Sequence, residues 1–183
     1  MNRSGWMVGS ASLAALAVPA IVVATNYQSV GQAQHLLFPL AARFDPVPVA
    51  LTAAQRNTLA ALAGPQPQHG SLQVFHVTDG RGQSSGYFFV DEVVGRQDLI
   101  TYALGIDANG KLSAVEILSY RESHGGEIRN AKWRAQFAGR DELAKLRFQT
   151  DIKNIAGATL SSQHVTQGVR WLLALWQTAL KSA

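Results

Sequence analysis

The sequence predicts an α+β fold: a curved antiparallel sheet with helices against one face, preceded by an apolar N-terminal segment. Three observations lead to this prediction. Residues 72–118 carry apolar side chains at a period of two in four short runs, which is typical of strands. Residues 161–180 carry them at steps of three and four, which is typical of one amphipathic helix. Residues 6–24 form an apolar run at the beginning of the sequence.

The N-terminal run has the composition of an export signal. No Asp, Glu, Lys or Arg occurs between Ser4 and Ala42, and Arg3 precedes the run 6–24. A positive start followed by an apolar stretch is the pattern of exported proteins. Residues 1–25 are therefore either a cleaved signal peptide or a retained membrane anchor, because the run nearly reaches the ~20 residues that a spanning helix needs. Both interpretations place the remainder in the periplasm, on the outer side of the cytoplasmic membrane.

The remainder divides into a connector, residues 26–50, and a domain, residues 51–183. Prolines exclude a long helix through the end of the connector, although 27–37 has room for a short one. The domain begins with a helix for which Thr52 is a good N-cap. The Gly64-Pro65 pair ends that helix.

Four strands are expected next, at 72–77, 87–94, 99–106 and 112–118. Tight turns join neighbouring strands, so they pair antiparallel. The Gly80-Arg-Gly82 stretch has the look of a dinucleotide-binding fingerprint, but it joins two strands and opens no helix, so we interpret it as a hairpin turn. A short helix over 127–137 follows the sheet.

Composition excludes several classes of function. The chain has 183 residues and a net charge of +4, yet its Lys and Arg residues form no cluster, so we expect no nucleic-acid partner. It has no cysteine, which excludes disulfides, cysteine-ligated iron–sulfur clusters and thioether-attached haem. The five histidines lack the spacing of metal ligands, so no metal site is expected.

The stretch with the clearest chemical character lies just before the last helix. Gly157 and Ala158 are small and let the backbone approach a ligand closely. Thr159 and Ser161 place hydroxyls at the start of the helix, where unpaired N–H groups and the helix dipole favour an anion such as a phosphate.

The stretch from Asp151 to Thr159 resembles the flavinylation motif of the FMN-binding domain family, which includes the RnfG and NqrC subunits of bacterial membrane redox complexes. In that family a flavin transferase joins FMN, through its phosphate, to the last Thr of the motif. The resemblance implies a phosphoester to Thr159, with Asp151 read by the transferase. The remaining site residues implied here are Gly157, Ala158, Leu160 and Ser161.

A second loop supports the resemblance. Residues 120–128 form a Gly-rich polar segment that is similar to the Glu-Thr-Pro-Gly-Leu-Gly loop lining the flavin in the family. The similarity implies flavin contacts from Glu122, Ser123, His124, Gly125 and Gly126. An ordinary strand-to-helix loop is the alternative. Trp133, on the short helix that follows, either packs in the core or flanks the flavin ring.

The resemblance implies an exported flavoprotein that carries electrons for a membrane-associated chain, as an electron-transfer subunit more than a stand-alone enzyme. Its partners would be a flavin transferase and a membrane redox protein. Two other hypotheses remain open. One is an exported binding or assembly module without a cofactor. The other is a serine hydrolase that uses Ser161 or Ser162 with His164 and Asp151.

Overall fold

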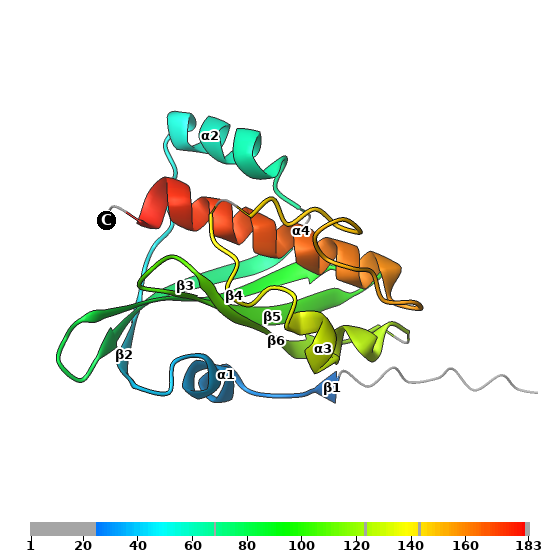
Figure 1. The fold of residues 1–183 in the computed structure, drawn as a ribbon, viewed down its shortest axis with the longest axis horizontal. Coiled ribbons are helices and arrows are strands. Elements are labelled where there is room, and N and C mark those ends of the chain that lie inside the picture. Colours follow the sequence, from blue (N-terminus) through cyan, green and yellow to red (C-terminus); the bar gives the residue numbers. More distant parts are fainter. Residues whose placement is uncertain (1–24, 68, 123, 143, 182–183) are drawn as a thin grey trace, which may run out of the picture.

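The sheet has six antiparallel strands in the order β1-β6-β5-β4-β3-β2 (Figure 1). The computed structural model describes residues 25–67, 69–122, 124–142 and 144–181. The predicted export or anchor segment therefore lies outside the described residues. The α+β class is confirmed. The strands are β1 (Thr25–Asn26), β2 (Ala41–Pro46), β3 (His69–Asp79), β4 (Ser84–Val94), β5 (Leu99–Asp107) and β6 (Leu112–Tyr120).

The four central strands, β3 to β6, correspond to the four runs seen in the sequence. Each pairs with the next through a tight turn. In the first turn the Asp79 carboxylate accepts the backbone N–H groups of Arg81 and Gln83. Asp107 accepts those of Asn109 and Lys111 in the same way. The glycine-containing stretch at 79–82 is thus a hairpin turn, as predicted.

The two outer strands extend this sheet. β1 pairs with β6 and places Thr25 opposite Tyr120. β2 pairs with β3 at the other edge. Helix α1 (Val30–Leu37) lies between β1 and β2 in the chain, with Ser29 and Gln32 forming a capping box. The segment predicted as a connector therefore contributes a helix and an edge strand to the fold.

Helices cover both faces of the sheet, which corrects the expectation of a single covered face. Helix α4 (Thr159–Leu175) lies on one face, with α2 (Ala53–Ala63) beyond it, and α1 lies on the other (Figure 1). The predicted N-cap Thr52 begins α2 and accepts the Gln55 N–H. The sheet's apolar residues accordingly form two clusters. The one beneath α1 comprises Ala33, Leu37, Phe38, Val77, Phe88, Val90, Ala103 and Leu118.

Helix α4 begins two residues earlier than the sequence predicts and ends in a wider π turn, Trp176–Leu180. Its buried side includes Val165, Val169 and Leu172, in agreement with the predicted apolar face. Gly168 lets the helix approach the sheet, because a Cβ at this position would lie closer than 3.0 Å to the Tyr102 hydroxyl. That hydroxyl donates to the buried Asp91 carboxylate at 2.6 Å.

Substitution of Gly168 by alanine is expected to destabilise the protein. The added methyl group would push α4 from Tyr102, and such overpacking costs about 1–3 kcal/mol, more than the roughly 1 kcal/mol that alanine contributes to a helix. Urea unfolding measures the difference. Gly31→Ala, in α1, is the matched control because its Cβ meets no atom closer than 4.0 Å. Equal stability of the two variants would contradict the close approach at Gly168.

The predicted helix over 127–137 is broken into two short pieces. A 3₁₀ turn, Gly126–Arg129, is followed by α3, Ala131–Arg134. Asn130 separates them and caps α3 by accepting the Lys132 N–H. Trp133 is 4% exposed, and its indole N–H donates to the Lys153 carbonyl at 2.8 Å. Trp133 is therefore a core residue that fixes the chain shortly before Thr159.

Among the described residues, no helix combines the length and apolar character needed to cross a membrane.

Candidate functional site

A pocket of about 540 Å³ opens at the N-terminal end of α4, within the size range of small-molecule sites. Three segments that are distant in sequence form it: the turn between β4 and β5, the loop after β6 and the start of α4. The lining residues are Arg96, Gln97, Glu122, His124, Gly157, Ala158, Thr159, Leu160 and Ser161. The structure thus brings together the two loops that the sequence singled out.

Thr159 is the first residue of α4, and its side chain is exposed. Ala158 occupies the N-cap position and offers no side-chain cap, so the first turn of a 17-residue helix keeps its N–H groups available. The Thr159 hydroxyl accepts a hydrogen bond from the Asn154 amide at 3.0 Å. The acceptor predicted for a phosphoester is therefore accessible and lies beside a favourable place for a phosphate.

The neighbouring hydroxyls are less accessible. Ser161 is 4% exposed and shares a 2.9 Å hydrogen bond with the Tyr120 hydroxyl. Ser162 is fully buried, and its hydroxyl contacts the Ala158 carbonyl at 2.8 Å. Of the three hydroxyls in this turn, that of Thr159 alone combines exposure with a place in the pocket lining.

The residues flanking Thr159 differ in their roles. Gly157 has a φ of +84°, and a Cβ there would meet no atom within 4 Å, so this glycine serves the backbone conformation and leaves the pocket mouth open. Ala158 is 2% exposed and anchors the turn in the core. Leu160 is 44% exposed and offers an apolar surface to a ligand.

Glu122 holds the opposite wall of the pocket in place. One of its carboxylate oxygens accepts the backbone N–H groups of Arg96, Gln97 and Asp98 at 2.5, 2.6 and 3.0 Å. Burial alone would raise the pKa of Glu122, but these three hydrogen bonds and the charge of Arg96 together lower it below its ordinary value of 4.5. Glu122 thus has a structural task in addition to any contact with a ligand.

The pKa shift of Glu122 predicts how stability depends on pH. A lowered pKa in the folded state stabilises the protein fully above the ordinary value of 4.5, and this contribution is lost as the pH falls through the folded value. We expect Glu122→Gln to cost about 1–2 kcal/mol near pH 7, because a charged acceptor is replaced by a neutral one. Urea unfolding from about pH 7 to pH 3 should show the difference shrinking below 4.5. A difference that stays constant with pH would contradict this role.

His164 fixes the same turn from the side of α4. Its Nδ1 lies 2.6 Å from the Val94 carbonyl and 3.0 Å from the Gly95 carbonyl. Carbonyl oxygens only accept, so Nδ1 carries a proton. The hydrolase hypothesis required His164 to face a serine and an aspartate. The structure instead pairs Ser161 with Tyr120, and Asp151 with Arg147.

The loop after β6 contributes unevenly to the pocket. His124 is exposed and lines it, and its carbonyl accepts the Tyr120 hydroxyl. Gly125 is buried behind the pocket with a φ of +91°. Gly126 is absent from the pocket lining and begins the 3₁₀ turn. Ser123 lies outside the described residues.

Asp151 does not line the pocket. Its carboxylate accepts the Arg147 backbone N–H at 2.8 Å and the Arg147 guanidinium at 3.1 Å. The pKa of Asp151 is lowered by these bonds, first by the one from the side chain. Asp151 therefore closes the loop that leads to α4. Its suggested recognition by a transferase remains a prediction.

Arg96 and Gln97 are the pocket residues that the sequence did not suggest. They lie in a polar turn between two strands, which has no feature of its own that indicates a ligand. Tertiary hydrogen bonds to Glu122 carry them to the pocket. Arg96 adds a cation to a lining that otherwise has one carboxylate, from Glu122.

No cluster of three or more His, Cys, Asp or Glu residues suited to a metal ion occurs in the described part of the chain.

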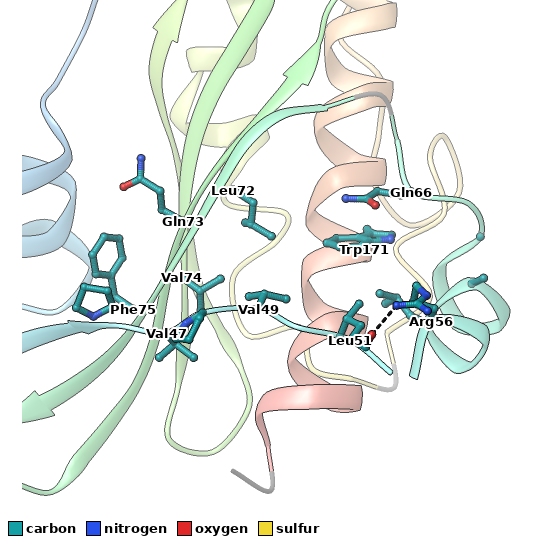
Figure 2. A pocket seen from close by; sticks show the side chains of 15 residues that line it. Val47, Val49, Leu51, Arg56, Gln66, Leu72, Gln73, Val74, Phe75 and Trp171 are labelled. Carbon is teal, nitrogen blue, oxygen red and sulfur yellow. Dashed lines mark hydrogen bonds between the residues drawn. The ribbon is translucent and has the colours of Figure 1, made fainter. Parts of the chain in front are cut away.

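A larger cavity, of about 970 Å³, lies between α2, β3 and the segment after β2 (Figure 2). It shares no lining residue with the pocket at Thr159, and Trp171 marks its position on α4. Twelve residues of helix separate Trp171 from Thr159, or roughly 18 Å at 1.5 Å per residue. Size alone would favour this cavity as a ligand site, but the predicted acceptor and both predicted loops belong to the smaller one.

Two comparisons with known proteins bear on the smaller pocket. Residues 95–174 match the FMN-binding domain family. The chain is also 26% identical, over 191 residues, to the RnfG-type component of the Na⁺-translocating ferredoxin:NAD⁺ oxidoreductase complex of Acetobacterium woodii. That alignment covers 96% of this chain and 90% of the relative.

The fold and the pocket therefore define a flavin-binding domain. Every residue that lines the pocket at Thr159 falls within the matched stretch, whereas Trp171 is the one residue of the larger cavity that does. The chain is an RnfG-like member of the FMN-binding domain family, and the resemblance seen in its sequence is confirmed.

Proposed function

We propose that this protein is an exported electron carrier whose FMN is attached by a phosphoester to the Thr159 hydroxyl. One observation carries the proposal: within an FMN-binding domain, Thr159 is an exposed hydroxyl on the first turn of a long helix, at the mouth of a pocket. FMN, when bound, supplies the electron chemistry, and the protein supplies attachment and surroundings.

The residues of the pocket fit such a group. The N–H groups of the first turn of α4 and the Arg96 side chain favour the phosphate. Leu160 and His124 offer surfaces for the flavin ring. Gly157 leaves the entrance open, and Glu122 keeps Arg96 and Gln97 in place from the far side.

The proposed partners follow from the relative. It is named as a component of a ferredoxin:NAD⁺ oxidoreductase complex that translocates Na⁺. By analogy we infer that this protein exchanges electrons with a membrane redox protein, on the periplasmic side where the sequence predicts export. A flavin transferase is the second partner. A tethered cofactor suits that location, since a dissociated FMN would be lost from the cell exterior.

The experiment is to co-express the full-length chain with a flavin transferase and to analyse it after denaturation. We expect an added mass of FMN minus water, and in-gel fluorescence. Trypsin should place the adduct in the peptide of residues 154–170, between Lys153 and Arg170, and fragmentation should locate it on Thr159. Absence of any adduct would favour the module without a cofactor. FMN that is lost on denaturation would support flavin binding but overturn the covalent bond.

A further inference from the structure

The Thr159 hydroxyl is engaged by a single amide. The Asn154 side-chain nitrogen donates to Thr159 Oγ1 at 3.0 Å, across the loop that enters α4. An amide NH₂ group donates and does not accept. The bond therefore occupies a lone pair of Oγ1 and leaves the hydroxyl proton directed elsewhere.

The Asn154 amide is oriented by a buried group. Ser162 Oγ donates to the Asn154 side-chain oxygen at 2.9 Å. Ser162 is fully buried and lies within reach of the carbonyls of Ala158, at 2.8 Å, and Thr159, at 3.1 Å. Because an amide presents oxygen on one side and NH₂ on the other, the contact with Ser162 determines that the NH₂ faces Thr159. A hydrogen-bonded chain thus runs from the core, through Asn154, to the exposed hydroxyl.

We propose that Asn154 is a positioning residue for flavin attachment, holding the Thr159 hydroxyl in one rotamer with its proton turned outward. This role rests on the proposed function. Threonine has few χ1 rotamers, so one hydrogen bond is enough to select among them. The selected rotamer presents the oxygen to an incoming phosphate at the pocket mouth.

The chemistry of attachment gives the Asn154 N–H a second use. With a flavin dinucleotide as the donor, the Oγ1–P bond forms while the pyrophosphate P–O bond breaks. The nucleoside monophosphate leaves with the electron pair, and the Thr159 proton passes to a base of the transferase. Negative charge develops on Oγ1 as that proton leaves. A hydrogen bond donated to this oxygen becomes stronger at that moment, as charge-assisted bonds are.

The test measures the rate of flavin incorporation into the full-length protein by intact mass, with purified flavin transferase and FAD. We expect Asn154→Ala to lower the turnover rate about three- to tenfold, the effect of one hydrogen bond, with KM and the melting temperature unchanged. Asn154→Asp should be as slow, since it can keep the contact with Ser162 but cannot donate to Oγ1. Gln163→Ala, another amide removed from the start of the same helix, is the control and should react like the wild type.

Ser162→Ala separates positioning from direct recognition. A transferase cannot touch a fully buried side chain, so a slower Ser162→Ala would show that the amide acts through its orientation. A slow Asn154→Ala beside an unchanged Ser162→Ala would mean that the transferase contacts Asn154 itself, and would overturn the positioning role. So would an Asn154→Ala or Asn154→Asp variant as fast as the wild type. A wild-type protein that acquires no flavin on Thr159 would overturn the proposed function as well.

Discussion

Thr159→Val is expected to abolish covalent flavin, whereas Thr159→Ser retains it. Valine keeps the shape and β-branching of threonine but has no nucleophilic oxygen. The side chain is exposed, so the variant should fold normally and lose at most about 1 kcal/mol with the bond from Asn154. Intact mass and in-gel fluorescence after co-expression with a flavin transferase measure the adduct.

The neighbouring hydroxyls make this a specific test. Ser161 and Ser162 are 4% and 0% exposed, and both are hydrogen-bonded, so neither is expected to replace Thr159 as the acceptor. Ser161→Ala should keep the adduct. An adduct that persists in Thr159→Val would show that another residue is modified, and the proposal for Thr159 would be wrong.

Gly125→Ala is expected to have the largest effect on stability and to distort the pocket. Its φ of +91° is unfavourable for a residue with a Cβ. A Cβ would in addition lie closer than 3.0 Å to the Tyr120 hydroxyl and 3.3 Å from Ser161 Oγ. Strain and overpacking together should lower the free energy of unfolding by about 2–4 kcal/mol. Urea unfolding measures it.

Gly157→Ala is the matched control for Gly125. Its φ of +84° is similar, but no atom lies within 4 Å of its Cβ position. It should therefore show the backbone strain alone, about 1 kcal/mol. The difference between the two variants isolates the close packing of Gly125 against Tyr120 and Ser161. Equal losses would mean that this packing has no energetic weight.

Local signals in the sequence predicted much of the fold. The central strands β3 to β6 alternate between buried and exposed residues and end in turns with Asp and Gly, so period and turn chemistry agree. Strand β2 was not predicted because it is an edge strand, largely exposed and without alternation, and it ends at Pro46. The second covered face was missed for the same reason, since α1 and β2 lie together in a stretch rich in proline.

The candidate site was predictable where the chain itself carries the signal. Thr159 and the loop beginning at Glu122 were found from their resemblance to a known family. Arg96 and Gln97 were not, because they enter the pocket through backbone hydrogen bonds to a carboxylate 24 to 26 residues away in sequence. The link from Ser162 through Asn154 to Thr159 is likewise tertiary, and the residue types alone do not reveal it.

The short pairing between β1 and β6 sets the direction from which the preceding chain reaches the molecule. Thr25 lies opposite Tyr120, whose hydroxyl bonds to Ser161 in the pocket. β1 and the first turns of α4 accordingly lie at the same end of the sheet (Figure 1). If residues 6–24 anchor the protein as the sequence predicts, the cofactor would stand close to the lipid headgroups. An electron partner embedded in the bilayer would then need no long reach, and rotation of the domain about its leash would keep the flavin near that partner.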